Sequence, residues 1–170
     1  MRPSRGVEAL RRRRFSTPNA SYFITICTHH RSPGLVTPAI ASFIKQELMA
    51  CELAGYWKVR GAVVMPDHVH MLVRLGCKLV LGNIIARVKS RTRVNSAEPA
   101  VRWQCNYYEH RMRPDDPAGD VLRYLYMNPY RAGLLSPGAK YPWFWLGSEE
   151  AAWFQPPRAG ETTTDPNWLQ

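Results

Sequence analysis

Two adjacent strand-like segments place the strongest constraint on how this chain can fold. Residues 57–65 and 68–75 are rich in β-branched and other apolar side chains, and only Pro66 and Asp67 separate them. A connection this short can join antiparallel strands, whereas parallel strands need a long crossover. The sequence therefore predicts a β-hairpin and, with it, an antiparallel sheet.

Further strand-like and helix-like segments flank the hairpin on both sides. Residues 21–28 predict a strand, and residues 40–51 carry apolar side chains at the spacing of a helix that ends near Gly55. After the hairpin, residues 103–112 predict another strand and residues 118–126 another helix. A second helix between these parts has one apolar stripe, formed by Leu81, Ile84, Ile85 and Val88.

The order of these segments is βαββαβα. Such an order is typical of an α+β sandwich of ferredoxin-like or RRM-like type. We expect helices to cover one face of the antiparallel sheet and to leave the other face available for a ligand. With 170 residues, the chain is long enough for one domain of this kind with a substantial core.

The net charge indicates the class of ligand. The chain has 23 lysines and arginines against 13 aspartates and glutamates, a formal net charge of +10. Such an excess favours a polyanion such as nucleic acid, through phosphate contacts and counterion release. Charge that serves solubility or membrane contact is the alternative. No apolar run approaches the roughly 20 residues that span a bilayer.

The beginning of the chain bears on its location in the cell. Residues 1–14 are basic and lack the apolar core of a secretory signal. We therefore expect a cytoplasmic protein without membrane contact.

Residues 65–73 (MPDHVHMLV) carry the most specific chemical signal in the chain. Side chains alternate along a strand, so His68 and His70 share one face while Val69 points into the opposite layer. Two neighbouring imidazoles can bind one divalent cation, although two strand histidines can also form local hydrogen bonds without a metal. Two ligands leave coordination positions open, as a cation that also binds a phosphate requires.

Two residues elsewhere are candidates for a further metal ligand. His110 lies on the predicted strand 103–112, and Asn128 lies at the end of the third helical segment. His110 could instead be an exposed or hydrogen-bonded histidine at a strand end. Asn128 could instead be the N-cap of a new short helix, because Pro129 disfavours the helical conformation for the residue before it.

Tyr124 is the candidate nucleophile. In helical projection Leu122, Leu125 and Tyr126 form the apolar stripe, whereas Tyr124 points away from it. A phenolate can attack a phosphodiester and form a covalent linkage, which a later hydroxyl can reverse without ATP. A phenol with a pKa near 10 needs help, which a metal that polarises the phosphate could give. A structural tyrosine is the alternative, and the weaker candidates are Tyr126, then Tyr107, Tyr108 and Tyr130.

In these blocks the sequence resembles the transposases associated with repeated extragenic palindromes (REPs), which belong to the single-tyrosine HUH transposases. The resemblance covers roughly residues 22–143. It rests on four ordered motifs: Met65-Pro66-Asp67-His68-Val69-His70; Trp103-Gln104 with Tyr107-Tyr108-Glu109-His110; Tyr124 with Asn128-Pro129 and Arg131-Ala132-Gly133; and Tyr141-Pro142-Trp143.

The resemblance implies both the chemistry and the substrate. It implies that His68 and His70 bind Mg²⁺ or Mn²⁺, that Asn128 supplies a further ligand, and that Tyr124 attacks DNA. The usual substrate of the family is single-stranded DNA with a palindromic hairpin, which is cleaved and rejoined through a 5′-phosphotyrosine. Such a protein would work at the bacterial nucleoid, as a monomer or homodimer.

The resemblance also suggests how the chain is divided. We expect a basic N-terminal arm over residues 1–20, an HUH catalytic domain over residues 21–135 and a C-terminal tail over residues 136–170. The tail could pack on the domain, contact DNA or shield the site. Trp103 and Tyr107 could stack on unpaired bases, although burial is equally compatible with the sequence.

Basic residues in two places are candidates for binding DNA phosphates. One set lies in the N-terminal arm and the other on the second helix, where a solvated helix face is an equally good interpretation. The candidates are Arg11, Arg12, Arg13, Arg14, Arg87, Lys89, Arg91 and Arg93.

Two other functions compete with the transposase. One is a non-catalytic nucleic-acid-binding module of ferredoxin-like fold, a domesticated relative that retains DNA recognition. The other is a metallohydrolase that activates a bound water, for which Tyr124 would be dispensable.

Overall fold

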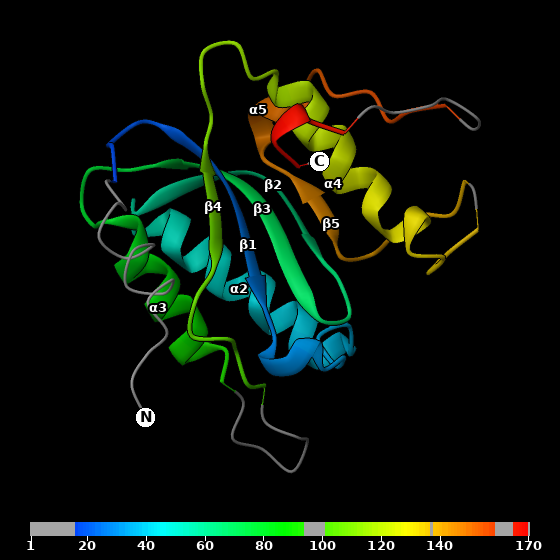
Figure 1. Cartoon of the computed structure of the whole chain (residues 1–170), viewed down its shortest axis with the longest axis horizontal. Helices are drawn as coiled ribbons and strands as arrows, with labels where there is room; N and C mark the ends of the chain where they lie inside the picture. The colour runs from blue at the N-terminus through cyan, green and yellow to red at the C-terminus, as the bar shows by residue number, and fades with distance from the viewer. Residues whose placement is uncertain (1–15, 94–100, 137, 159–164, 170) are drawn as a thin grey trace.

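A five-stranded sheet forms the centre of the computed structural model, which describes residues 16–93, 101–136, 138–158 and 165–169. The strands lie in the order β4-β1-β3-β2-β5, and each neighbouring pair is antiparallel (Figure 1). Strands β2 (Trp57–Val64) and β3 (His68–Leu75) form the predicted hairpin, and β1 (Ser21–Cys27) pairs with the other edge of β3. The predicted α+β class with an antiparallel sheet is confirmed.

Helices α2 (Pro38–Leu53) and α3 (Leu81–Arg91) cover one face of the sheet (Figure 1). The side chain of Thr37 caps the N-terminus of α2 by accepting a hydrogen bond from the Ile40 amide, and Pro38 suits the first turn because a helix needs no N–H donor there. The predicted apolar stripe of α3 is fully buried. These two helices and the sheet enclose the larger part of the core.

Helix α4 (Ala118–Arg131) departs from the expected arrangement, because it packs on the opposite face of the sheet. Phe23 of β1 and Leu72 of β3 present apolar side chains on that face, and they pack with Leu122 and Leu125 of α4. Gly61 of β2 permits a close approach, since a Cβ atom there would lie 2.5 Å from Leu122 Cδ2. The second face is therefore partly covered by the helix that carries Tyr124.

Strand β4 (Tyr108–Arg111) is shorter than the predicted strand 103–112. Trp103 forms only an isolated bridge with Thr28, and its indole N–H donates to Thr92 Oγ1 at 2.9 Å. Lys89 Nζ donates to the carbonyl oxygens of Gln104 and Asn106, each at 2.7 Å. The Gln104 amide still donates to the Cys27 carbonyl at 2.9 Å, but the carbonyls of Gln104 and Asn106 bond to Lys89 of α3, so regular pairing with β1 starts only at Tyr108.

The segment expected as a tail packs on the domain. Within it, β5 (Phe144–Leu146) adds an edge strand to β2, and the Tyr141 hydroxyl donates to the Val64 carbonyl at 2.8 Å. After α5 (Ser148–Ala151), the short 3-10 helix η2 (Asn167–Leu169) lies beside α4 (Figure 1). No helix within the described ranges is both long and apolar enough to cross a membrane.

Candidate active site

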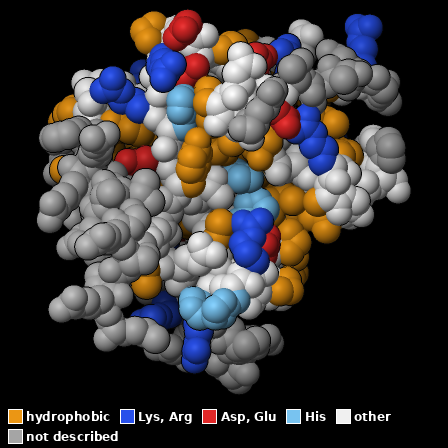
Figure 2. All heavy atoms as spheres, in the orientation of Figure 1, with side chains coloured by type: hydrophobic (Ala, Val, Ile, Leu, Met, Phe, Trp, Pro, Cys, Tyr) orange, Lys and Arg blue, Asp and Glu red, His pale blue; other side chains and the backbone are white. Residues whose placement is uncertain are grey.

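His68 and His70 lie on the face of the sheet that α4 partly covers. Because side chains alternate along β3, both imidazoles point to this face, while Val69 is buried in the core on the other side as predicted. The two ring centroids are 4.3 Å apart, and the planes meet at 74°. On the same side of the molecule, histidine side chains reach the surface near the centre of the view, beside basic and acidic groups (Figure 2).

Hydrogen bonds orient both imidazoles through their Nδ1 atoms. His70 Nδ1 lies 2.7 Å from Thr25 Oγ1 on the neighbouring strand β1, and His68 Nδ1 lies 2.6 Å from Asp67 Oδ1. The other carboxylate oxygen of Asp67 pairs with Arg31 Nε at 2.7 Å. If each Nδ1 carries the proton, Nε2 of each ring has the lone pair that a metal ion needs.

Burial keeps both histidines in the form that binds metal. Desolvation lowers the pKa of His68, an effect that the hydrogen bond and charge of Asp67 oppose. Desolvation also lowers the pKa of His70 well below 6.5, and His68 and Arg31 add to this effect. Neutral imidazoles at neutral pH can coordinate a cation without first losing a proton.

Tyr124 reaches this face from α4. Its ring centroid lies 5.5 Å from that of His70 and 5.9 Å from that of Phe23, in edge-to-face geometry with both. The guanidinium carbon of Arg131 lies 5.8 Å from the ring centroid. Burial raises the pKa of the Tyr124 hydroxyl above 10, and the side chain of Asn128 partly offsets this effect. The phenol is therefore neutral at neutral pH.

Asn128 lies inside α4, four residues after Tyr124 and on the same side of the helix. The interpretation of Asn128 as an N-cap is wrong, because α4 continues through Pro129 to Arg131 without starting a new helix. The Asn128 amide nitrogen donates to the Tyr124 carbonyl at 2.8 Å. Its Oδ1 atom is thus the one that remains for a cation.

His110 occupies a different part of the same face. It pairs in register with Phe23, and its Nε2 lies 2.8 Å from Asp116 Oδ2. Its ring stacks on Trp168 with centroids 3.9 Å apart and planes at 8°. The contacts of His110 are thus those of a hydrogen-bonded, stacked histidine rather than of a third member of the His68 and His70 pair.

The other tyrosines have different surroundings. Tyr126 contacts Phe144 and Phe154 and shares a hydrogen bond of 3.1 Å with Tyr130, so it packs with the C-terminal segment. Tyr107 packs against the core on the α3 side of the sheet. Tyr108 is 45% exposed and contacts Phe23, with ring centroids 6.3 Å apart. Tyr124 is the tyrosine whose ring contacts a histidine of the pair.

The basic residues on and after α3 that were predicted to bind DNA do not lie around this pair. Arg87 lies over the ring of Tyr56, Lys89 holds two backbone carbonyls, and Arg91 forms an ion pair with Glu47, all on the opposite layer. Arg93 follows α3 and is exposed. Arg11, Arg12, Arg13 and Arg14 lie outside the described residues.

Three residues near the histidines were missed by the sequence analysis: Thr25, Asp67 and Arg31. Thr25 could have been found only with the register of β1 against β3, which pairs Thr25 with His70. Asp67 lies in the connection between β2 and β3, where an aspartate is common for reasons of turn geometry alone. Arg31 belongs to η1 (His29–Arg31), whose backbone has no recognisable sequence pattern.

The donor atoms of this face fit a divalent cation. Two neutral imidazoles leave positions for a substrate oxygen, and Asn128 Oδ1 is an acceptor on the facing helix. Among the residues that the structure describes, no group of three or more histidine, cysteine, aspartate or glutamate side chains could hold a metal. A third protein ligand would therefore be of another type, as an amide oxygen is.

Comparisons with known proteins agree on one family. Residues 16–124 match the family described as "Transposase IS200 like", a span that ends at Tyr124. A relative from Haemophilus influenzae (strain ATCC 51907 / DSM 11121 / KW20 / Rd), described as "Putative REP-associated tyrosine transposase", is 25% identical, and the match covers 77% of this chain and 82% of the relative.

A solved structure shares the fold. It is described as "Structure of the REP associates tyrosine transposase bound to a REP hairpin", and it superimposes with a TM-score of 0.72. The match covers 91% of this chain and 93% of the other, at 19% sequence identity. At this identity the likeness concerns the arrangement of the backbone.

Proposed function

Because the chain belongs to the family of IS200-like transposases, we propose that it cleaves and rejoins single-stranded DNA at palindromic, REP-like hairpins. Cleavage would depend on a divalent metal and pass through a covalent 5′-phosphotyrosine on Tyr124. The protein would then work on chromosomal DNA at the nucleoid, as a monomer or homodimer.

The observation that carries the proposal is the position of Tyr124 opposite the histidine pair. The rings of Tyr124 and His70 lie 5.5 Å apart on different elements, α4 and β3. A phosphodiester bound beside these two rings would be within reach of both the phenolic oxygen and the metal that the imidazoles would hold. Neither a structural tyrosine nor a hydrogen-bonded histidine pair needs this arrangement.

The reaction can be written from the residues of the site. The Tyr124 oxygen attacks phosphorus and gives up its proton, the bond between phosphorus and the 3′ oxygen breaks, and that oxygen leaves with a proton as a hydroxyl. A 3′ hydroxyl that attacks the phosphotyrosine reverses these changes and joins strands. Nε2 of His68 and His70, with Asn128 Oδ1, would hold Mg²⁺ or Mn²⁺, whose charge stabilises the phosphate oxygens during attack.

Among the described residues, Arg31 brings a cation to the histidine pair, as Arg131 does to Tyr124. Arg31 is paired with Asp67, and its side chain is 51% exposed. Its charge depresses the pKa values of both His68 and His70, which means that it lies within electrostatic reach of the pair. We assign it to a DNA phosphate near the cleaved bond. The cations of the N-terminal arm and of α3 remain candidates for binding the rest of the hairpin.

The hairpin substrate is inferred from the relatives. The Haemophilus relative is described as REP-associated, and the solved structure of the same fold is described as bound to a REP hairpin. The net charge of +10 favours the same kind of ligand.

The competing function is a DNA-binding module without catalysis. A covalent adduct separates the two. The protein would be mixed with labelled single-stranded DNA hairpins from around its own gene, in Mg²⁺, Mn²⁺ or chelator, and run on a denaturing gel. We expect an adduct with metal that is absent in chelator and in Tyr124→Phe, and that persists in the matched control Tyr126→Phe.

Two results would change the assignment. Binding without an adduct for every hairpin would favour the non-catalytic module. Metal-dependent cleavage that survives in Tyr124→Phe would favour a metallohydrolase that uses water.

A further inference from the structure

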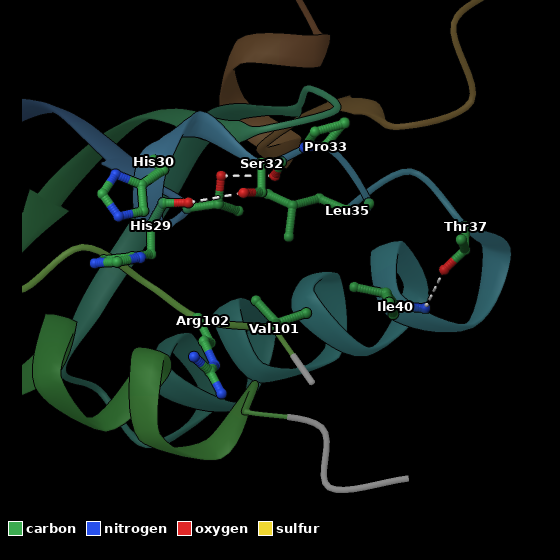
Figure 3. Close-up of a pocket in the computed structure, with 11 residues that line it drawn as sticks. His29, His30, Ser32, Pro33, Leu35, Thr37, Ile40, Val101 and Arg102 are labelled. Carbon is green, nitrogen blue, oxygen red and sulfur yellow. Dashed lines mark hydrogen bonds between the residues drawn. The ribbon is translucent and has the colours of Figure 1, made fainter. Parts of the chain in front are cut away.

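A cavity of about 600 Å³ opens at the end of β1, beside the turn that joins β2 to β3 (Figure 3). Its apolar lining includes Leu35, Ile40 and Val101, which belong to the core on the side of α2 and α3. Polar and basic side chains line the rest of it, among them His29, His30 and Arg102. The family resemblance and the proposed catalytic residues do not account for this cavity.

The cavity and the histidine pair share a wall. Thr28 lines the cavity, and both its amide nitrogen and its hydroxyl donate to the Asp67 carbonyl at 2.9 Å. Gly34 and Leu35, also in the lining, donate their amides to the Pro66 carbonyl at 2.8 and 2.9 Å. Asp67 in turn holds His68. One hydrogen-bonded turn thus separates the proposed cleavage site from the cavity.

The backbone of η1 directs one side chain towards the histidine pair and two others into the cavity. His30 and Arg31 both have positive φ angles, 54° and 55°, a conformation that non-glycine residues rarely adopt and that often marks a functional segment. Arg31 turns to Asp67 beside the histidine pair, whereas His29 and His30 line the cavity. A DNA strand held by Arg31 at the cleavage site would therefore meet the cavity next.

The lining suits a nucleotide. In Figure 3, His29, His30 and Arg102 lie toward one end, and the apolar side chains lie around the middle. The rings of His29 and His30 are 3.9 Å apart and exposed, so they can stack on a base. Arg102 is exposed and can bind a phosphate, and none of the described lining residues is acidic.

We propose that this cavity binds one unpaired nucleotide of the substrate strand, adjacent to the phosphodiester that Tyr124 cleaves. The base lies against His29, His30 and the apolar lining, and Arg102 holds its phosphate. This inference rests on the proposed function. It adds a specificity site that reads the single-stranded flank rather than the hairpin.

A thermodynamic cycle between a base and the cavity tests the proposal. DNA hairpins with single-stranded flanks would carry an abasic site at each flank position in turn, and their affinity would be measured by fluorescence anisotropy in chelator, which prevents cleavage. For the wild-type protein, one abasic position should weaken binding about tenfold, as expected for the loss of one stacked base. The double variant His29→Ala/His30→Ala should bind intact DNA about tenfold more weakly than the wild type does. In this variant the same abasic site should cause no further loss of affinity.

Two further variants make the result specific. Arg102→Ala should weaken binding of intact and abasic DNA alike, because it removes a phosphate contact and leaves the stacking site. The matched control Arg74→Ala changes an exposed arginine near the other end of β3, so it should keep the full abasic effect. The residues changed to alanine are exposed, so thermal unfolding should show that each variant folds.

The proposal would be overturned if the abasic site lowered the affinity equally in the double variant and in the wild type. It would also be overturned if an abasic site at no flank position lowered the affinity of the wild type. Failure of the proposed function is read separately, in the adduct assay. A Tyr124-dependent adduct with an unchanged abasic effect would remove only the cavity assignment. Loss of DNA binding in every form would remove both.

Discussion

His70 and Tyr124 face one another edge to face, with ring centroids 5.5 Å apart, although β3 carries one and α4 the other. The fully buried ring of Phe23 contacts both, at 5.4 and 5.9 Å. The spacing between the proposed nucleophile and the proposed metal ligand is therefore set by core packing rather than by a loop.

Tyr124→Phe should separate chemistry from stability. Phenylalanine keeps the ring contacts with Phe23 and His70, so the free energy of unfolding should change by less than about 0.5 kcal/mol. Denaturant unfolding would measure this change, while the adduct assay should show complete loss. A large loss of stability would mean that the hydroxyl has a structural role.

Thr25→Val should weaken metal binding. Without the hydroxyl, His70 Nδ1 loses its partner on β1 and the ring loses its fixed tautomer. We expect Mn²⁺ affinity, measured by isothermal titration calorimetry without DNA, to fall by about 10- to 100-fold, the usual effect of removing such a partner. Thr25→Ser keeps the hydroxyl and should keep the affinity. Equal affinity in the valine variant would contradict a positioning role for Thr25.

The role of Asn128 as a metal ligand can be tested with two substitutions, one that keeps a side-chain oxygen and one that removes it. Asn128→Asp keeps an oxygen but loses the amide donor to the Tyr124 carbonyl, whereas Asn128→Ala loses both. If Oδ1 is a metal ligand, Mn²⁺ affinity should survive in the aspartate variant and fall about tenfold or more, at least ~1.4 kcal/mol, in the alanine variant. Equal affinity in both variants and the wild type would leave Asn128 as a residue that only stabilises α4.

Tyr141→Phe should reveal how firmly the C-terminal segment is held. Its hydroxyl donates to the Val64 carbonyl, and losing that bond should cost about 1 kcal/mol in the free energy of unfolding near pH 7. Burial raises the pKa of Tyr141 to about 12, above its value near 10 in the unfolded chain.

The sign of that pKa shift fixes the pH dependence. A raised pKa in the folded state means that the contribution is complete below pH 10 and is lost as the pH rises towards 12. The difference between wild type and Tyr141→Phe should therefore be constant at neutral pH and shrink in this alkaline range. Urea unfolding at several pH values measures it, and a difference that grows above pH 10 would contradict the assignment.

Periodicity was sufficient to predict most of the fold. The alternation in residues 68–75 placed His68 and His70 on one face, and the stripe of α3 was found at its residues. The length of β4 was not predictable, because it depends on hydrogen bonds that Lys89 and Thr92, 11 to 17 residues earlier in the chain, form with residues 103–106. The three-residue strand β5 is too short to show a period.

The residues of the site were predictable only where they lie close together in the sequence. The pair His68 and His70 is local in sequence, whereas Thr25 becomes its neighbour through strand register. The course of α4 through Pro129 overrode a local rule, since the helix packs on the sheet from Val121 onward and carries the proline within it. The metal, the nucleophile and the DNA contacts remain predictions.

Gly61→Ala should disturb the site through the contact between β2 and α4. Its Cβ would lie 2.5 Å from Leu122 Cδ2, which is fully buried and has little room to move. Overpacking of this kind costs about 1–3 kcal/mol. We expect lower stability in urea and less adduct, because α4 has to move and Tyr124 moves with it. The double variant Gly61→Ala/Leu122→Val should regain both, and an unchanged single variant would contradict this account.

The contact between Gly61 and Leu122 also limits how such a chain can diverge. A larger residue at position 61 would be inherited only together with a smaller one at position 122, so the two positions should covary among relatives although β3, α3 and β4 lie between them in the sequence. A lineage that lost the glycine without that compensation would keep its histidines and its tyrosine, yet hold them at the wrong spacing. Such a chain would look catalytic by its motifs and be inactive by its packing.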